Sequence, residues 1–367
     1  MAPRNTATPE DAMPTDPDAH AQARELTWGV DLTGPDGRLN PAAVGWARHP
    51  LVDTTGIGRG PHRSWGRTKR WEYWNVATPT HVMALTVSSL DYAAVHEVWL
   101  FDRADHRTWH RSATVLPARG VTLPPRLDAG VARARAKDLT IDIEPGGSPS
   151  DGSHSDGSAS SVHLRARIPG AEIDVVAVRP ADHECLAVVV PFSATRFQYT
   201  VKDVTLPAHG TVRIDGVEQV VPAGESWAVL DHGRGRWPYR ARWQWGAGSG
   251  VSNGRVVGIQ FGGAWTAGTG QTENGVILDG ILHKIHDELA WQVDRANYLA
   301  PWRIRGPRLD ATFTPVYDRK SRTNLGVVSS RTDQCFGYWS GSFVTIVGET
   351  VIFDGIFGWA EDVDNRW

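Results

Sequence analysis

Apolar and polar residues alternate with a period of two along much of this chain, which is the pattern of β-strands that bury one face. The alternation is clearest on both sides of Asp215-Gly216 and Asp279-Gly280. Asp-Gly dipeptides accept the positive φ angles of a tight hairpin turn. Asn253-Gly254 and Gly348-Glu349 stand in similar places between apolar segments. The pattern therefore predicts four β-hairpins.

Other apolar segments bounded by turn residues predict further strands. They cover residues 81–88, 95–102, 139–143, 161–168, 173–179 and 187–192. Helical periodicity is confined to short stretches such as 41–46. We therefore expect an all-β protein of antiparallel strands, arranged in two barrel-like or sandwich-like halves, with few short helices.

Changes in composition suggest how the chain is divided. Residues 1–25 lack an apolar stretch and are predicted to be a flexible tail rather than a signal peptide. Residues 145–160 are rich in Gly, Ser and Asp and predict a flexible loop joining two paired strands, 139–143 and 161–168. A glycine-rich stretch at 246–250 suggests a boundary between a first domain, 26–245, and a second, 246–367, although strands could exchange between them.

Composition excludes several classes of function. With 41% hydrophobic residues the chain can form a substantial core, and its net charge of −3 does not suggest nucleic acid as a partner. Two cysteines are too few for a disulfide framework or a zinc site, so we expect no metal and a reduced, cytoplasmic location. No apolar run is long enough to span a membrane, and no phosphate-binding or dinucleotide-binding motif is present. We therefore expect no cofactor.

The chain contains 17 tryptophans, many of them beside charged or amide residues. An indole is a large, rigid apolar ring with one N–H donor, so such clusters suit a pocket that encloses a small molecule while a few polar atoms orient it. The sequence therefore predicts a ligand-binding site, and three clusters could contribute to it.

The first cluster is Asp231-His232-Gly-Arg234-Gly-Arg-Trp237, which follows the apolar strand 227–230. A glycine-containing loop at a strand end could present Asp231 or His232 as a general acid and Arg234 as a clamp for an anion or carbonyl. Alternatively, Asp231 pairs with a neighbouring arginine to hold a corner, while Trp237 fills the core.

The second cluster is the glycine-rich segment 262–275 between two strands. It brings Trp265, Gln271, Glu273 and Asn274 together, so we expect it to contact the ligand, with Glu273 as the catalytic carboxylate. If Glu273 lies against Trp265 without a cationic neighbour, desolvation raises its pKa and keeps it a proton donor near neutrality. Alternatively, the segment is a long surface turn.

The third cluster is Lys69-Arg70-Trp71-Glu72-Tyr73-Trp74. On a strand, Arg70, Glu72 and Trp74 face one way and the other three residues the opposite way, so both faces mix polar and aromatic groups. Such a strand could be a pocket wall or a seam between barrels; alternatively, it is an edge strand with a solvated Arg70–Glu72 pair. Candidate ligand contacts from this cluster and from elsewhere in the chain are Arg70, Trp71, Glu72, Trp74, Trp243, Trp245 and Glu361.

Near the C-terminus, Trp359 is expected to pack in the core. The acidic residues that follow it are expected to be capping or surface groups, with Glu361 kept as a reserve candidate for the site.

Several of these motifs, taken in order, resemble a bacterial family called domain of unknown function 2804, over residues 26–367. They are KRWEYW (69–74), DHGRGRWP (231–238), WQWG (243–246), QFGGAWT (260–266), TENG (272–275), QCFG (334–337) and GWAE (358–361). That family carries no activity to transfer. More distantly, the chain is similar in size, strand content and tryptophan content to the tandem lipocalin-like proteins that include carotenoid 1,2-hydratase and tocopherol cyclase. This resemblance implies a ligand site in or between two barrel-like halves, with acid chemistry on a prenyl or polyene substrate.

Three functional hypotheses remain. In the first, the protein is a cofactor-independent lyase or isomerase that encloses an apolar isoprenoid- or polyketide-like molecule and acts on it through carboxylate acids. In the second, tryptophans stack on sugars and two carboxylates, such as Asp231 and Glu273, bind or hydrolyse a glycan. In the third, the protein binds a ligand without catalysis. An enclosed cavity favours the first and an open groove with coplanar rings the second. We expect the first, with an apolar small molecule as ligand. The oligomeric state is not predicted.

Overall fold

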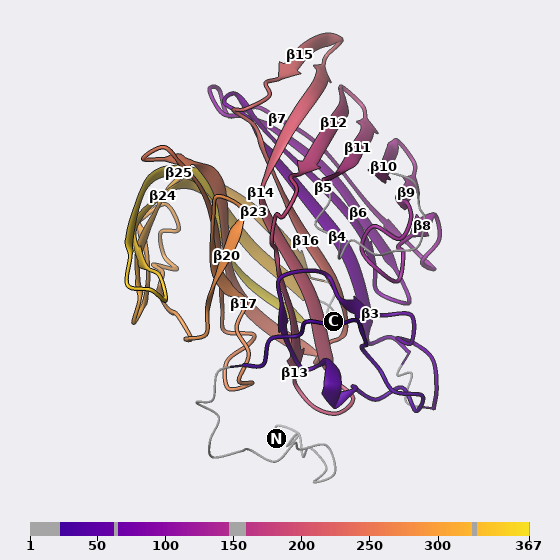
Figure 1. The fold of residues 1–367 in the computed structure, drawn as a ribbon. Coiled ribbons are helices and arrows are strands. Elements are labelled where there is room, and N and C mark those ends of the chain that lie inside the picture. Colours follow the sequence, from indigo (N-terminus) through magenta and orange to yellow (C-terminus); the bar gives the residue numbers. More distant parts are fainter. Residues whose placement is uncertain (1–22, 62–64, 147–158, 325–328, 367) are drawn as a thin grey trace.

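The computed structural model describes residues 23–61, 65–146, 159–324 and 329–366. Within these ranges there is no α-helix, and the only helical element is the short 3-10 helix η2 (Pro41–Ala43). Apart from one short parallel pair of strands, the rest of the regular structure is two curled antiparallel sheets that each form a half-barrel (Figure 1). The predicted all-β class is therefore confirmed.

The first sheet contains most of the strands before residue 240. Its 14 strands within the described residues are β2 (Gly45–Ala47), β4 (Thr68–Ala77), β5 (His81–Ser89), β6 (Ala94–Asp102), β7 (Thr108–Val115), β8 (Val121–Thr122), β9 (Ala132–Ala136), β10 (Leu139–Gly146), β11 (Ser160–Ile168), β12 (Ala171–Arg179), β13 (Leu186–Pro191), β14 (Phe197–Ile214), β15 (Val217–Val221) and β16 (Trp227–Arg236). The main path of the sheet runs β7-β6-β5-β4-β16-β14-β12-β11-β10-β9-β8. A separate parallel pair joins β1 (Val30–Asp31) to β3 (Val52–Asp53).

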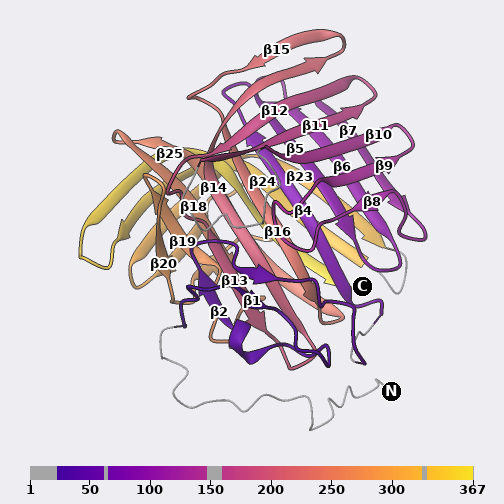
Figure 2. The same ribbon diagram turned by 45° about the vertical axis from the view of Figure 1, so that its right-hand side comes forward.

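The long strand β14 lets the first sheet curl over itself. Its register against β16 shifts between Asp203 and Leu206, where Thr205 has a φ of 62°. Such an irregularity bends a strand and increases its twist. The part before the shift pairs with β13, and the part after it pairs with β12 and β15 (Figure 2). Strands β8–β12 thus cover β4–β7, and residues such as Leu85, Leu164 and Ile173 form a core between them.

The second sheet contains the strands from residue 240 onwards. They are β17 (Arg240–Ser252), β18 (Arg255–Gly263), β19 (Asn274–Leu278), β20 (Ile281–Ile285), β21 (Ala290–Gln292), β22 (Trp302–Gly306), β23 (Leu309–Asn324), β24 (Ser329–Val344) and β25 (Thr350–Arg366). Their order is β20-β19-β18-β17-β25-β24-β23-β22-β21. The concave face encloses its own core, which includes the fully buried Trp302, Phe313 and Trp339.

A third core lies between the two sheets. Val229 of β16 and Trp99 of β6 belong to the first sheet, whereas Trp245 of β17 and Trp359 of β25 belong to the second, and all four are in this core. The chain leaves the first sheet after Arg236 and enters the second at Arg240. The change of sheet therefore falls before the expected boundary at 246, because residues 240–245 pair with β25. The division into two domains stays a prediction.

Most of the predicted strands and turns are confirmed. The four hairpins join β14 to β15, β19 to β20, β17 to β18 and β24 to β25. The six other predicted strands correspond to β5, β6, β10, β11, β12 and β13, and β10 pairs with β11 as expected. Residues 1–22 of the predicted tail and 147–158 of the predicted loop lie outside the described residues. The described ranges hold no helix of the length and apolarity that crossing a membrane requires.

One predicted element is wrong. Residues 231–236, interpreted as a loop, continue β16 as regular strand between β4 and β14. The glycines in this segment suggested a turn, but they make room for neighbouring groups. A Cβ on Gly233 would lie 2.1 Å from Cζ2 of Trp71, and one on Gly235 would lie 2.2 Å from Oε1 of Gln198.

Candidate functional site

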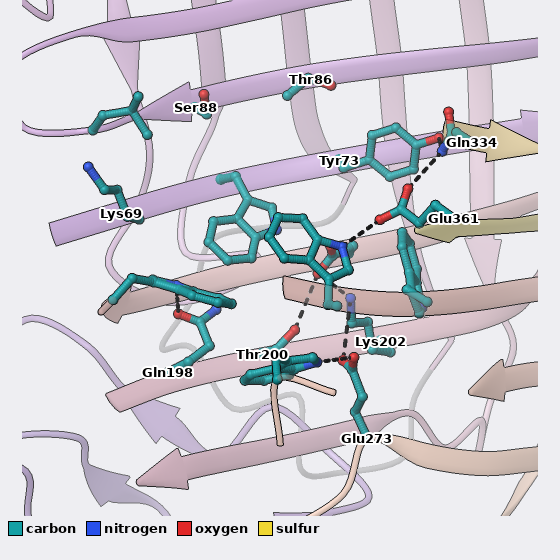
Figure 3. Close-up of a pocket in the computed structure, with 17 residues that line it drawn as sticks. Lys69, Tyr73, Thr86, Ser88, Gln198, Thr200, Lys202, Glu273, Gln334 and Glu361 are labelled. Carbon is teal, nitrogen blue, oxygen red and sulfur yellow. Dashed lines mark hydrogen bonds and ion pairs between the residues drawn. The ribbon is translucent and has the colours of Figure 1, made fainter. Parts of the chain in front are cut away.

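A cavity of about 260 Å³ lies between the two sheets, beside the third core. Its aromatic residues are Trp71, Tyr73, Trp237, Trp243, Trp245 and Trp265. Its charged residues are Lys69, Lys202, Asp231, Glu273 and Glu361. Leu90 and the polar Thr86, Ser88, Gln198, Thr200 and Gln334 complete the lining (Figure 3).

Strand alternation places these side chains. Lys69, Trp71 and Tyr73 are alternate residues of β4, and Gln198, Thr200 and Lys202 are alternate residues of β14. Alternate residues of a strand point to the same face, so each strand contributes one row to the cavity. The second sheet supplies the opposite wall, with Gln334 from β24 and Glu361 from β25 (Figure 3).

The tryptophan rings surround the cavity rather than form one flat platform. Trp237 is central: its ring centroid lies 5.4 Å from that of Trp265, 6.0 Å from that of Trp71 and 6.0 Å from that of Trp243. The interplanar angles are 30°, 48° and 52° respectively. The Trp237 N–H donates to Oε1 of Gln198 at 2.8 Å, which fixes the ring. The rings thus present their faces from several directions to an enclosed ligand.

Lys202 links two of the three carboxylates. Its Nζ lies 3.0 Å from Oδ1 of Asp231 and 3.6 Å from Oε2 of Glu273, and it stands 3.8 Å from the ring centroid of Trp245. Burial acts to lower the pKa of Lys202, but the charges of Asp231 and Glu273 outweigh it and raise the pKa overall. Lys202 is therefore a fixed ammonium group rather than a nucleophilic amine.

Glu361 is held by neutral donors. The Trp243 N–H donates to its Oε1 at 2.8 Å, and Nε2 of Gln334 donates to its Oε2 at 3.3 Å. Burial raises the pKa of Glu361 to about 7, against the opposing effects of the Trp243 hydrogen bond and of Lys202. The charges of Asp231 and Glu273 raise it further. Glu361 thus exchanges a proton near neutral pH inside an aromatic cavity, as a general acid must.

The surroundings of Glu273 agree with the sequence expectation in two respects and differ from it in a third. It accepts a short hydrogen bond from the Trp265 N–H, and burial raises its pKa. The condition that no cation lies beside it is not met, because Lys202 is its neighbour. That charge opposes the effect of burial and makes Glu273 a weaker candidate for the acid than Glu361.

The structure brings eight of the predicted site residues to this cavity. They are Asp231, Glu273, Glu361, Trp71, Trp237, Trp243, Trp245 and Trp265. The acidic residues after Trp359 are expected to be capping or surface groups; Glu361 and Asp362 do not lie at the surface but are buried, whereas the Asp364 side chain is 36% exposed. Trp359 itself is in the core, as expected.

Five predicted site residues instead point into the core of the first sheet. They are Arg70, Glu72, Trp74, His232 and Arg234, which alternate with the cavity residues on β4 and β16. Nη2 of Arg234 lies 3.1 Å from Oε1 of Glu72, and Nδ1 of His232 lies 3.5 Å from the same oxygen. Burial and the charge of Arg234 lower the pKa of His232. These residues are placed away from the cavity because a strand cannot turn neighbouring side chains to one face.

Two residues of the predicted loop also lie elsewhere. Asn274 is buried, and its side chain hydrogen-bonds to the backbone of two other segments. It accepts from the Gly262 N–H at 2.7 Å and donates to the Asp287 carbonyl at 3.0 Å. Gln271 lines a different, larger cleft that also includes Lys284 and Arg48. Trp265 and Glu273, at either end of the loop, are the members that reach the cavity between the sheets.

Sequence reasoning missed the β14 row, including the central Lys202. The segment 197–202 alternates strictly, with Gln198, Thr200 and Lys202 separated by apolar residues. This pattern predicts a strand with one polar face, and it is the feature of the sequence from which these cavity residues could have been found. Tyr73 and Gln334 belong to the motifs KRWEYW and QCFG, but they are not among the site residues predicted from the sequence. Nε2 of Gln334 lies 3.3 Å from the Tyr73 hydroxyl and connects the two sheets.

Within the described ranges, no group of three or more His, Cys, Asp or Glu side chains is arranged to hold a metal ion. The carboxylates of the cavity, Lys202 and the aromatic rings are side chains that can transfer a proton or stabilise charge there.

Comparison with solved structures finds proteins that align over most of this chain. An AttH candidate from Nitrosomonas europaea aligns over 83% of this chain and 94% of its own, with 12% identity and a TM-score of 0.51. Kievitone hydratase from Nectria haematococca aligns over 93% and 98%, with 10% identity and a TM-score of 0.47. CghA aligns over 82% and 88%, with 9% identity and a TM-score of 0.40. At such identities the first of these supports a common fold only.

Among proteins with curated functions, none matches this sequence significantly. A family model does match, over residues 23–367, which include both sheets and every side chain of the cavity. The chain therefore belongs to the family described as Domain of unknown function (DUF2804).

Proposed function

We propose that this protein is a cofactor-independent lyase or isomerase that protonates a carbon–carbon double bond of a small apolar molecule in the cavity between the sheets. The observation that carries the proposal is the placement of Glu361, a buried carboxyl group with a pKa raised to about 7 by burial, among tryptophan faces. A proton donor in such surroundings suits a substrate that offers no strongly basic atom.

The chemistry has two steps. Glu361 transfers its proton to one alkene carbon, which leaves a carbocation on the neighbouring carbon. The faces of Trp71, Trp243 and the other indoles, together with the nearby carboxylates, stabilise that positive charge. The carboxylate of Asp231, oriented by Lys202 and by the Thr200 hydroxyl at 3.2 Å, then accepts a proton.

The product depends on which atom gives up the proton that Asp231 accepts. If water adds to the carbocation and loses a proton to Asp231, the net reaction is hydration. If Asp231 removes a proton from an adjacent carbon, the product is an isomer, and attack by a second double bond before this loss gives a ring. The cavity volume of about 260 Å³ lies just below the usual range of about 300–1,000 Å³ for small-molecule pockets, so a short isoprenoid or a compact polyketide fits better than a long polyene.

The glycan alternative is less well supported. Flat, exposed and coplanar rings would favour stacking on sugars, whereas Trp237 lies at 48° to Trp71 and at 52° to Trp243. In addition, Lys202 lies between Asp231 and Glu273, the two carboxylates of that hypothesis. A lysine held there occupies the place of the substrate oxygen or the attacking water.

Isotope labelling tests the proposal while the substrate is still unidentified. The purified protein is incubated in D₂O with an extract of small apolar molecules from the source cells, and products are analysed by mass spectrometry. We expect one compound to acquire a carbon-bound deuterium, with or without added water, because the acid exchanges its proton with solvent. Glu361→Gln removes the transferable proton and should abolish labelling while the fold persists.

The matched control is Glu218→Gln, the same substitution at an exposed residue of the β14–β15 hairpin. Labelling by Glu218→Gln should equal that by the wild type. Labelling that persists in Glu361→Gln would rule out Glu361 as the acid, and no protein-dependent labelling at all would count against alkene protonation.

A further inference from the structure

Glu361 belongs to a row of three side chains that crosses the second sheet. Arg319 of β23 is paired directly with Gln334 of β24, and Gln334 is paired directly with Glu361 of β25. Directly opposite residues on neighbouring strands share one face of a sheet, so the three side chains are neighbours. Nη1 of Arg319 donates to Oε1 of Gln334 at 3.1 Å, and Nε2 of Gln334 donates to Oε2 of Glu361 at 3.3 Å (Figure 3). A continuous line of hydrogen bonds thus runs from Arg319 to Glu361.

Arg319 is held in place by the first sheet. Its Nη2 lies 2.6 Å from Oε1 of Glu97 on β6, and its guanidinium carbon stands 4.4 Å from the ring centroid of Trp99 on the same strand. Oε1 of Glu97 also lies 2.7 Å from Nε2 of His110 on β7. Burial acts to raise the pKa of Glu97, but the charge of Arg319 and the contact with His110 outweigh it and lower the pKa to about 2. An ionised carboxylate and an aromatic ring therefore fix the guanidinium group.

The orientation of the Gln334 amide follows from the chemistry of Arg319. An amide has an oxygen that accepts and a nitrogen that donates, and either can face a given neighbour. A guanidinium group has donors only, so Oε1 of Gln334 faces Arg319 and Nε2 faces away from it. Nε2 there meets Oε2 of Glu361 and the Tyr73 hydroxyl, each at 3.3 Å. Without Arg319 the amide is free to turn its oxygen towards the carboxylate.

We propose that Arg319 is a positioning residue for the acid Glu361, because it fixes the Gln334 amide as a hydrogen-bond donor to the carboxylate. Arg319 is not among the described residues that line the cavity, so it acts through Gln334. A donor to a carboxylate stabilises the ionised form. The fixed amide therefore opposes the effect of burial and helps Glu361 to release its proton. The part of Arg319 in catalysis rests on the proposed function, whereas its effect on the titration of Glu361 does not.

Titration of Glu361 by NMR tests the proposal without a substrate. The full chain is labelled with ¹³C at the glutamate carboxyl carbons, and the Glu361 signal is identified by its absence in Glu361→Gln. Arg319→Met removes the donors, and we expect it to raise the proton affinity of Glu361 by about tenfold, as the loss of a hydrogen bond to a charged group implies. Arg319→Lys, which again offers donors only, should restore most of the wild-type value.

A cycle with Gln334→Met separates positioning from the simple loss of a charge. Gln334→Met removes the amide and should raise the proton affinity of Glu361 by itself. Adding Arg319→Met to it should change that affinity by less than about twofold, because residues that act through one another are not additive. A purely electrostatic effect of Arg319 would persist in the absence of Gln334. Arg319→Met combined with Glu97→Gln removes both charges of the ion pair, leaves no carboxylate without its arginine, and should titrate as Arg319→Met does.

The matched control is Arg103→Met. Arg103 likewise contacts the second sheet, donating to the Tyr338 hydroxyl at 3.0 Å and standing 3.7 Å from the ring centroid of Phe357. This control should leave the titration of Glu361 as in the wild type. The proposal is overturned if Arg319→Met leaves that titration unchanged, if Arg103→Met changes it equally, or if the effects of Arg319→Met and Gln334→Met add in full.

Deuterium labelling keeps this result separate from the proposed function. If alkene protonation occurs, Arg319→Met should also slow deuterium incorporation, because a carboxyl group that holds its proton more tightly is a weaker acid. A wild type that labels no compound, with the titrations as expected, would contradict the proposed function and support the positioning of Glu361 by Arg319. Unchanged titration in Arg319→Met, with labelling by the wild type intact, would reject the positioning alone.

Discussion

Glu361 differs from the other carboxylates of the cavity in its partners. Asp231 and Glu273 share the ammonium group of Lys202, whereas the hydrogen bonds to Glu361 come from an indole N–H and an amide. A nearby cation stabilises a carboxylate, while neutral donors compensate burial only in part. Of the three, we therefore propose Glu361 as the group that releases and recovers a proton near neutrality.

Stability as a function of pH provides a test of Glu361 that needs no substrate. Burial raises the pKa of Glu361 to about 7 from an ordinary value of 4.5, so the folded protein holds this proton more tightly than the unfolded chain. Its contribution to stability is complete below pH 4.5 and is lost as pH rises through 7. In Glu361→Gln this group no longer titrates, so the variant does not lose that contribution to stability as pH rises. From about pH 4.5 to 8 the free energy of unfolding of the variant should therefore rise relative to wild type, on the order of 3 kcal/mol.

Denaturant unfolding of both proteins across this pH range measures the difference, and Glu218→Gln should show none of it. A pH-independent difference between Glu361→Gln and wild type would show that the carboxyl group titrates normally, and the general acid role would then fail. Catalytic turnover, once a substrate is known, should fall as pH rises through the raised pKa of Glu361 because the acid must be protonated.

At the scale of single elements, β16 shows how a strand can serve two environments. Its alternate residues face the cavity on one side and the core of the first sheet on the other, with Asp231 on the first face and His232 on the second. The cavity face then continues with Gly233 and Gly235, which have no side chain. The space they leave is filled by the ring of Trp71 and the amide of Gln198, both of which line the cavity.

Gly233→Ala should therefore act through Trp71. The added Cβ would lie 2.1 Å from Cζ2 and 2.6 Å from Cη2 of that ring, which must move. Overpacking of this kind costs about 1–3 kcal/mol, measurable by denaturant unfolding, and the displaced ring should change the fluorescence of the cavity tryptophans. Gly250→Ala on β17 is the control, since the nearest atom to its Cβ is the terminal methyl of Ile356 at 3.3 Å. An equal cost at both positions would refute the space-filling role of Trp71.

At the scale of the whole molecule, the core between the sheets joins the two halves. Trp359 is only 1% exposed, and its ring contacts Tyr73 of the first sheet as well as Trp245 and Phe336 of the second. The cavity lies beside this core, so the relative position of the sheets also sets the distances between the side chains that line it.

Trp359→Ala should weaken the whole assembly. Removal of a buried indole costs about 3–5 kcal/mol, and here the loss falls on the contact between sheets. We expect calorimetry to show one unfolding transition for the wild type and two separated transitions for the variant. Trp28→Ala, at a residue that is 54% exposed, should leave the single transition in place. One transition shifted to lower temperature in Trp359→Ala would mean that the sheets unfold together without this contact.

Local sequence determined much of this architecture. Hairpins at Asp215-Gly216, Asn253-Gly254 and Asp279-Gly280 follow from turn chemistry, and strand positions follow from period-two alternation, because both are interactions between neighbours in sequence. The same local rules correctly separated the two faces of β4. They also identified the aromatic and acidic residues from which the cavity is built, including Trp71, Trp237 and Glu273.

Only the tertiary structure decided which of those residues meet and what each can do. Strand alternation predicts that the side chains of Asp231 and His232 point in opposite directions, but the packing of the two sheets decides which of them faces the cavity. Lys202 is 29 residues from Asp231 in sequence and 71 from Glu273, yet its ammonium group lies 3.0 Å from an oxygen of the first and 3.6 Å from an oxygen of the second. The pKa of Glu361 likewise depends on burial by a second sheet. Desolvation and electrostatics act through space, so they become readable only when strands distant in sequence are brought together.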